Sequence, residues 1–207
     1  MLERFKAFWQ GVVLAPVVRL FLRLGISPDA VTLVGTLGVV AGALVFFPQG
    51  LLWQGVLVIT AFVFSDLLDG QMARVSGTTS RFGAFWDSTL DRLGDAAVFG
   101  GLVLYFAGPG DDFLYLCLAL YCLVMGSVTS YARARAESLG MEAKGGLAER
   151  ADRLVAILVL TFFGDLLGLP ILYQGTLWAL AAASTYTVVF RVLKVRRQAL
   201  ELGPLPK

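Results

Sequence analysis

Histidine is absent from the 207-residue sequence and cysteine is scarce. Without histidine, a histidine general base and histidine-ligated zinc or iron are excluded, so any bound metal must be a hard cation held by oxygen, such as Mg²⁺ or Mn²⁺. The two cysteines, Cys117 and Cys122, share one apolar run and would point in different directions on a helix, which implies no disulfide framework. Charge is also sparse, because 15% of the residues are charged and 57% are hydrophobic. This balance is typical of a polytopic membrane protein.

Long apolar runs fill most of the chain, whose mean hydropathy is +0.77. They predict an all-α integral membrane protein with six transmembrane helices near the roughly 20 residues that span a bilayer, of which the fifth is the shortest and could extend beyond Phe163. The expected ranges are about Val31–Phe47, Leu51–Gly70, Phe82–Phe106, Phe113–Arg133, Asp152–Phe163 and Tyr173–Lys194.

Positive charge is missing from one side of this six-helix arrangement. All 17 Lys and Arg residues fall on the same side, whereas the connections at 48–50, 107–112 and 164–172 carry none. Cytoplasmic connections are the ones enriched in Lys and Arg. The sequence therefore predicts a multi-pass protein of the cell membrane with both termini, and the connection near residue 77, in the cytoplasm.

The N-terminal segment, residues 1–24, is expected to form juxtamembrane helices ahead of a six-helix domain at 25–207. Charged residues are interleaved with apolar ones over residues 2–14, which argues against a cleavable signal peptide. Phe5, Phe8 and Trp9 fall on one helical face. This pattern predicts an amphipathic helix that lies in the membrane interface, followed by a second short helix over 16–24.

Four carboxylates stand inside or beside apolar runs, at Asp66, Asp69, Asp87 and Asp91. The spacings of three and four place each pair on one face of a helix. Ionisable groups in membrane segments usually mark function, and a bound divalent cation is the simplest way to keep four carboxylates together. The alternative is a charge-paired bundle, in which nearby arginines neutralise the aspartates.

A site of this kind near the headgroup level suits chemistry on a lipid pyrophosphate. Hard cations can bridge phosphate oxygens and stabilise a leaving group. Asp91 could act as a general base on an attacking hydroxyl. Arg74 could pair with a phosphate through its planar fork, and Gly70 and Ala73 would leave room for a flat base.

The residues from Asp66 to Asp91 spell D-x2-D-G-x2-A-R-x8-G-x3-D-x3-D. This pattern resembles the signature of the CDP-alcohol phosphatidyltransferase family. The resemblance implies transfer of a phosphatidyl group from CDP-diacylglycerol to a hydroxyl, with release of CMP. It further implies a homodimer and a two-metal site for Mg²⁺, with Mn²⁺ possible, and it makes Asp91 the proton acceptor. The implied metal ligands are Asp66, Asp69, Asp87 and Asp91.

The same resemblance implies contacts with CDP-diacylglycerol from three places in the chain. Gly70, Ala73 and Arg74 match the nucleotide-binding part of the signature, and Ser80 matches a further nucleotide contact. A stretch at the start of the first expected spanning helix is similar to an element that also touches the CDP moiety. Its residues are Asp29, Ala30, Val31 and Thr32.

Within the family, the chain is most similar to the actinobacterial phosphatidylinositol phosphate synthases. The supporting stretches are GISPDAVTLVGTLGVVAGAL, TSRFGAFWDSTLDRLGDAAVFGGL and SYARARAESLGMEAKGGLAERADRL. The implied acceptor is an inositol phosphate, whose phosphate needs extra cations. We predict that Arg133, Arg153 and Arg191 supply them, because three arginines from three helices could hold a dianion. The bias of positive charge toward the cytoplasm is the alternative explanation for each of them.

Other functions stay open at this level. Phosphatidylglycerophosphate synthase would use glycerol 3-phosphate, which the same arginines could bind. A divalent-cation transporter is a different class, but the carboxylates lie near one membrane face and the sequence shows no internal repeat. A structural scaffold would not require four carboxylates. The expected partners are lipid and a phosphorylated polyol, and no nucleic acid.

Overall fold

Helices make up the whole of the regular structure over the described part of the chain. The computed structural model describes residues 15–77, 80–147 and 149–202, without the side chains of residues 65–67. The helices are α2 (Ala15–Arg23), α3 (Pro28–Ala41), α4 (Leu52–Val63), α5 (Ser65–Ser76), α6 (Arg81–Ala107), α7 (Phe113–Ser138), α8 (Arg150–Leu166) and α9 (Ile171–Leu202). A π-helical segment, η2 (Gly42–Phe46), and a 3₁₀ turn, η3 (Phe47–Gln49), extend α3. The described residues contain no strand, and the all-α prediction is confirmed.

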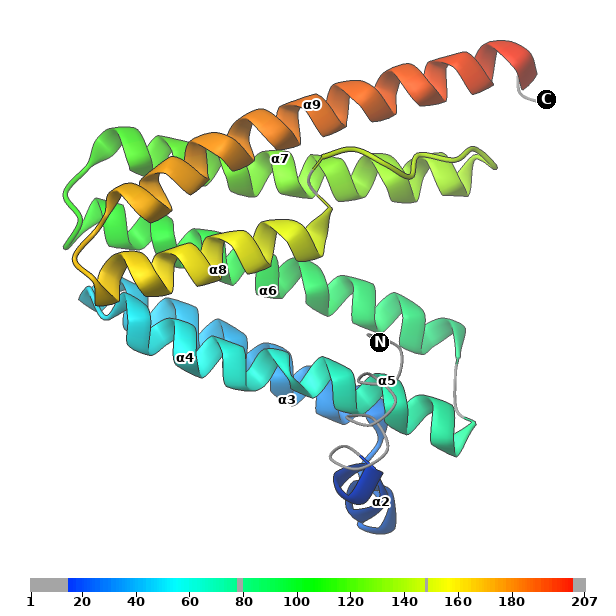
Figure 1. Cartoon of the computed structure of the whole chain (residues 1–207). Coiled ribbons are helices and arrows are strands. Elements are labelled where there is room, and N and C mark those ends of the chain that lie inside the picture. The colour runs from blue at the N-terminus through cyan, green and yellow to red at the C-terminus, as the bar shows by residue number, and fades with distance from the viewer. Residues whose placement is uncertain (1–14, 78–79, 148, 203–207) are drawn as a thin grey trace, which may run out of the picture.

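Four helical segments are long and apolar enough to cross a membrane: Pro28–Gln49, Leu52–Ser76, Phe113–Ser138 and Ile171–Leu202. They correspond to the first, second, fourth and sixth predicted spans. Helix α6 lies beside α7, and α8 lies between α4 and α9 (Figure 1). The first half of α6 is rich in charge and α8 has only 17 residues, so neither has a long, uncharged window. Their crossing of the bilayer stays a prediction.

Only the second of the two predicted N-terminal helices lies in the described part of the chain. The expected amphipathic helix over residues 2–14 lies outside the described residues. Helix α2 matches the second short helix, and its Val18 side chain is buried against Val31 and Met72. Helix α2 therefore packs on the start of the first span and the end of the second, and its place at the membrane interface stays a prediction.

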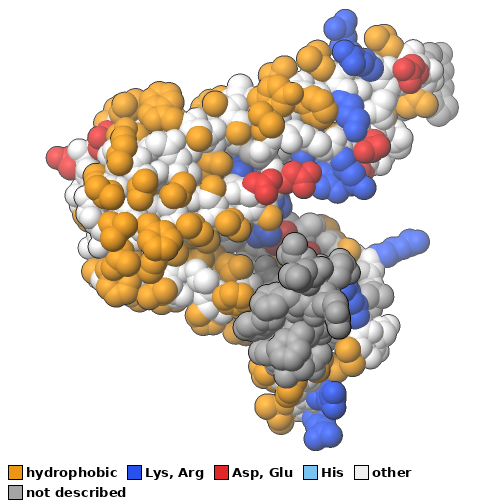
Figure 2. All heavy atoms as spheres, in the orientation of Figure 1, with side chains coloured by type: hydrophobic (Ala, Val, Ile, Leu, Met, Phe, Trp, Pro, Cys, Tyr) orange, Lys and Arg blue, Asp and Glu red, His pale blue; other side chains and the backbone are white. Residues whose placement is uncertain are grey.

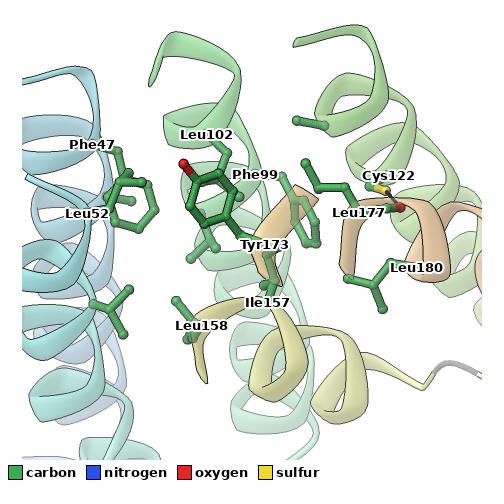
Figure 3. Close-up of a cluster of buried hydrophobic side chains, with 14 of the residues drawn as sticks. Phe47, Leu52, Phe99, Leu102, Cys122, Ile157, Leu158, Tyr173, Leu177 and Leu180 are labelled. Atoms are coloured by element: carbon green, nitrogen blue, oxygen red, sulfur yellow. Dashed lines mark hydrogen bonds between the residues drawn. The ribbon is translucent and has the colours of Figure 1, made fainter. Parts of the chain in front are cut away.

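Close backbone contact holds the first two spans together. A Cβ atom at Gly38 would overlap the ring of Phe62, and one at Gly42 would lie 2.9 Å from Ile59. The core continues from there into α6, α8 and α9, where bulky side chains such as Leu102, Ile157 and Leu177 interlock (Figure 3). This packing forms the apolar core of the bundle, away from the site.

The polar end of the bundle is open. Helices α7 and α9 project together on one side, and α5 and the start of α6 project on the other (Figure 1). Figure 2 shows hydrophobic side chains over the opposite end and charged side chains around the hollow between the two projections. The charge is therefore concentrated where the predicted site residues lie.

Candidate active site

The carboxylates of the candidate site come from α5 and α6. Asp87 and Asp91 are one turn apart on α6, and Asp69 on α5 is close enough to both to interact electrostatically with them. Asp69 is buried, Asp87 is exposed, and the Asp91 side chain is 20% exposed. Asp66 belongs to the first turn of α5, but its side chain lies outside the described part of the structure. Three of the four predicted metal ligands are thus brought near one another.

The donor set is chemically suited to a hard cation. The Oδ2 atom of Asp69 is buried and has no hydrogen-bond partner. A buried carboxylate oxygen without a partner is costly, and a bound cation would satisfy it. Among the described side chains, no three carboxylates lie in an arrangement that could hold one metal ion. The predicted ligand set includes Asp66, whose side chain is not among them.

Asp91, the predicted base, is held by arginine. Arg150 Nη1 lies 2.9 Å from Asp91 Oδ1, and Arg92 Nη2 lies 3.8 Å from Asp91 Oδ2. The Nε atom of Arg150 also lies 3.0 Å from Asp95 Oδ1, one turn further along α6. Asp95 Oδ2 in turn lies 3.7 Å from Arg153 Nη2. This network joins the start of α8 to the middle of α6.

The start of α3 is fixed against the start of α6. Ser27 caps α3 by accepting a hydrogen bond from Ala30 N at 3.2 Å, and the Trp86 indole donates to Asp29 O at 3.2 Å. Ser80 caps α6 and accepts from the N–H of Gly83 at 2.9 Å. A Cβ atom at Gly83 would meet both Ser80 Oγ and Asp29 Oδ1. Two of the predicted CDP contacts therefore lie side by side.

The remaining predicted CDP contacts are divided between exposed and buried positions. Thr32 is buried and lies beside the Asp69 carboxylate. Val31 is buried in the small core with Val18 and Met72, which is a packing position. The exposed or half-exposed ones are Ala30, Gly70, Ala73 and Arg74. No atom lies within 4 Å of where a Gly70 Cβ would be, and Arg74 pairs with no described carboxylate, so this face of α5 is open.

A cleft of about 860 Å³ lies next to the carboxylates, between α6, α7, α8 and α9. All three arginines predicted to bind the acceptor phosphate line it, together with two others: Arg92, Arg133, Arg150, Arg153 and Arg191. Arg150 also lines a small, largely apolar cavity beside Asp91. The Arg150 side chain therefore belongs both to the cleft and to the site formed by the carboxylates.

The three predicted arginines differ in how firmly they are held. Arg133 is 40% exposed and pairs with Glu137 at 2.9 Å on the same helix. Arg153 is 2% exposed beside Asp95. Arg191 is also buried and donates to the carbonyl oxygens of Thr129 and Gly145 at 2.7 and 3.2 Å. Two of the three are thus rigidly positioned at the wall of the cleft.

A model of the CDP-alcohol phosphatidyltransferase family matches residues 25–190. The chain belongs to this family. It is 48% identical to the phosphatidylinositol phosphate synthase of Streptomyces avermitilis over 97% of this chain and 85% of that protein. It is also 48% identical to the synthase of Cutibacterium acnes, over 95% of this chain and 98% of that protein.

Two crystal structures of the Mycobacterium tuberculosis phosphatidylinositol phosphate synthase share this fold. The one with bound CDP-diacylglycerol has a TM-score of 0.89 at 40% identity, covering 94% of this chain and 99% of that one. The one with manganese and citrate has a TM-score of 0.85 at 42% identity, covering 89% of each chain. The protein is therefore a phospholipid-synthesising transferase, a CDP-alcohol phosphatidyltransferase with membrane-type helices.

In this transferase, the sequence-based choice of three arginines leaves out Arg150. Its position carried a signal, since Arg150 and Arg153 are three residues apart and share a helical face. The capping box of Glu149 and Asp152 starts α8 at Arg150, which turns both guanidinium groups toward α6. The sequence does not reveal that Arg150 pairs with Asp91, because Asp91 belongs to a helix far from α8 in the sequence.

Proposed function

We propose that this protein transfers the phosphatidyl group of CDP-diacylglycerol to a hydroxyl of an inositol phosphate, which yields phosphatidylinositol phosphate and CMP. The observation that carries the proposal is the cleft lined by five arginines beside Asp91. A phosphate monoester is a dianion that arginines bind with charge-assisted hydrogen bonds. The cleft would hold the acceptor phosphate and leave a ring hydroxyl facing the carboxylates.

Hydroxyl groups that line the same cleft favour a polyol. Ser88, Thr89, Ser127 and Thr129 line the cleft, and each donates its hydrogen to a carbonyl oxygen one turn earlier at 2.7 to 3.0 Å. Their oxygen atoms are therefore left to accept hydrogen bonds. An inositol ring offers several hydroxyl donors at once, whereas glycerol 3-phosphate offers two.

The proposed chemistry assigns one task to each group of residues. The Asp91 carboxylate takes the proton of the attacking hydroxyl, whose oxygen forms the new bond to the β-phosphorus while the bond to CMP breaks. Arg74, together with the starts of α3 and α6, orients the CDP moiety. Asp66, Asp69, Asp87 and Asp91 would hold two Mg²⁺ ions, or Mn²⁺, and these ions would neutralise the pyrophosphate and stabilise the leaving group.

The distribution of charge supports the proposed orientation. The basic side chains surround the end of the bundle that holds the cleft (Figure 2). We therefore infer that the site and both termini face the cytoplasm of a cell-membrane protein. The homodimer stays an inference from the family resemblance.

The test is an acceptor assay. Purified protein in detergent receives CDP-diacylglycerol and Mg²⁺, and CMP release is measured with inositol phosphate, glycerol 3-phosphate, inositol or serine supplied singly. We expect release with inositol phosphate alone. Release only with glycerol 3-phosphate would keep the reaction class and overturn the proposed acceptor.

A matched pair of variants tests the cleft itself. Arg133→Gln should raise the KM for inositol phosphate about 10- to 100-fold, the worth of a hydrogen bond between charged groups. Arg135→Gln removes the same charge two residues away on α7, at an exposed position that does not line the cleft, and should leave that KM unchanged. Equal effects of the two variants would argue against a specific phosphate site.

A further inference from the structure

The connection between α7 and α8 runs back along α9 instead of crossing freely to its next helix (Figure 1). A single stripe of α9 side chains contacts it, at positions 187, 191, 194 and 198, which share one helical face. Each contact engages a backbone group of the connection. From Thr187 toward the C-terminus of α9, the four side chains bond in turn to Leu147 N, Gly145 O, Lys144 O, and both the N–H and the carbonyl of Glu142.

The contact at the far end of this stripe is reciprocal. Gln198 Nε2 donates to the carbonyl oxygen of Glu142 at 2.7 Å, and the Glu142 N–H donates to Gln198 Oε1 at 2.8 Å. One amide side chain therefore satisfies both backbone groups of one residue. Lys194 adds an ion pair of 3.3 Å to the Glu142 carboxylate and a bond of 3.0 Å to Lys144 O.

The connection is shaped to lie against α9. Gly145 and Gly146 have φ angles of +103° and +126°, which favour glycine. A Cβ atom at Gly146 would overlap Thr187, and one at Gly145 would lie 3.2 Å from Phe190. Ala143 is fully buried. This segment is therefore docked by both hydrogen bonds and close packing.

The docked connection leads directly into the acceptor cleft. It ends at Glu149, whose N–H donates to Asp152 at 3.2 Å, and α8 then presents Arg150 and Arg153. Arg191, the second residue of the α9 stripe, lines the cleft itself. Gln198 stands two helical turns beyond Arg191, roughly 10 Å along α9, and does not line the cleft.

We propose that Gln198 is a positioning residue for acceptor binding: by holding Glu142, it keeps the α7–α8 connection on α9 and so keeps Arg150 and Arg153 in place. The inference rests on the proposed function, which makes these arginines acceptor ligands. Without Gln198 the two Glu142 backbone groups bond to water, and the far end of the connection keeps its Lys194 contacts but is held more loosely. Arginines that must be re-ordered on binding give a weaker acceptor complex.

The test compares Gln198→Ala with Leu200→Ala, a control at an exposed position on the same turn of α9. We expect Gln198→Ala to raise the KM for inositol phosphate about tenfold, the worth of two exposed hydrogen bonds. The KM for CDP-diacylglycerol and the kcat at saturating acceptor should not change. Hydrogen exchange of residues 141–147 should accelerate, with an unchanged thermal unfolding midpoint. Leu200→Ala should match the wild type throughout.

Each contrary outcome has a distinct meaning. Faster exchange of the connection with an unchanged acceptor KM would overturn the positioning role. A fall in the unfolding midpoint with both KM values raised would overturn it too, since that pattern reports general destabilisation. If wild-type protein releases no CMP with inositol phosphate, the proposed function fails; an active wild type with an unaltered Gln198→Ala variant removes only the positioning role.

Discussion

The ion pair between Arg150 and Asp91 makes a prediction about metal affinity. Arg150 Nη1 lies 2.9 Å from Oδ1 of Asp91, which is one of the proposed metal ligands. A cation that binds this carboxylate must compete with the guanidinium group. The substitution Arg150→Gln removes the competing charge and leaves Asp91 in place. We therefore expect the variant to bind Mn²⁺ more tightly than the wild type, although it loses acceptor binding.

The magnitude follows from the exposure of the pair. The Arg150 and Asp91 side chains are 31% and 20% exposed, so the pair lies between an exposed one, worth up to about 1 kcal/mol, and a buried one. We take about 1 to 1.5 kcal/mol for the interaction that the metal must displace. Since about 1.4 kcal/mol corresponds to a factor of ten, the Kd for Mn²⁺ should fall about five- to tenfold.

The assay is calorimetric titration of Mn²⁺ into metal-free protein in detergent, at about 0.15 M salt to screen distant charges. Arg135→Gln is the matched control, because it removes the same charge from an exposed position, where Arg135 donates to Ser138 on its own helix. Its Kd should change little. An unchanged or weaker Kd in Arg150→Gln, or an equal gain in both variants, would refute the competition between Arg150 and the metal. The KM for inositol phosphate should rise in Arg150→Gln alone.

Three further predictions concern the base, the packing of the first two spans and the end of the bundle opposite the cleft. Asp91→Asn should lower kcat by about 10² to 10⁴, the usual contribution of a general base, and CMP release would show it. Gly38→Ala should lower the free energy of unfolding by about 1 to 3 kcal/mol, because the new Cβ atom overlaps Phe62. Gly70→Ala is the matched control, because no atom lies within 4 Å of its Cβ position. It should retain wild-type stability but raise the KM for CDP-diacylglycerol. Asp165→Ala should lower the unfolding free energy by about 1 kcal/mol without changing either KM, since Asp165 Oδ2 accepts from a backbone N–H at the start of α4 at 2.9 Å. Thermal unfolding in detergent would test both stability predictions.

The helices were largely predictable because apolar runs and caps are local features. The start of α7 at Phe113 was predicted to the residue, and α6 differs by one residue at each end. The ends of α5 and α9 were predicted too early, at Gly70 and Lys194. A hydropathy pattern ends where the apolar run ends, but the backbone hydrogen bonds of a helix continue into polar sequence until a cap stops them. In α5 that cap is Gly77, with φ of +67°.

The candidate site was predictable in its carboxylates and only partly in its cations. The carboxylate spacings of three and four are periodic on a helix, so they can be read without tertiary information. The arginines had no comparable pattern, since the bias of positive charge toward the cytoplasm places every one of them at the same end. Arg133, Arg153 and Arg191 do line one cleft, but so do Arg92 and Arg150.

The sequence by itself determined the class of the protein, its helices and the family signature, because hydropathy, helical periodicity and a motif of 26 residues are properties of short stretches. Only the tertiary structure decided that Arg150 pairs with Asp91 and that Gln198 holds Glu142. These partners are more than 50 residues apart in the chain, and no local period couples them. They meet because the bundle packs α8 between α4 and α9, and directs the α7–α8 connection back along the surface of α9.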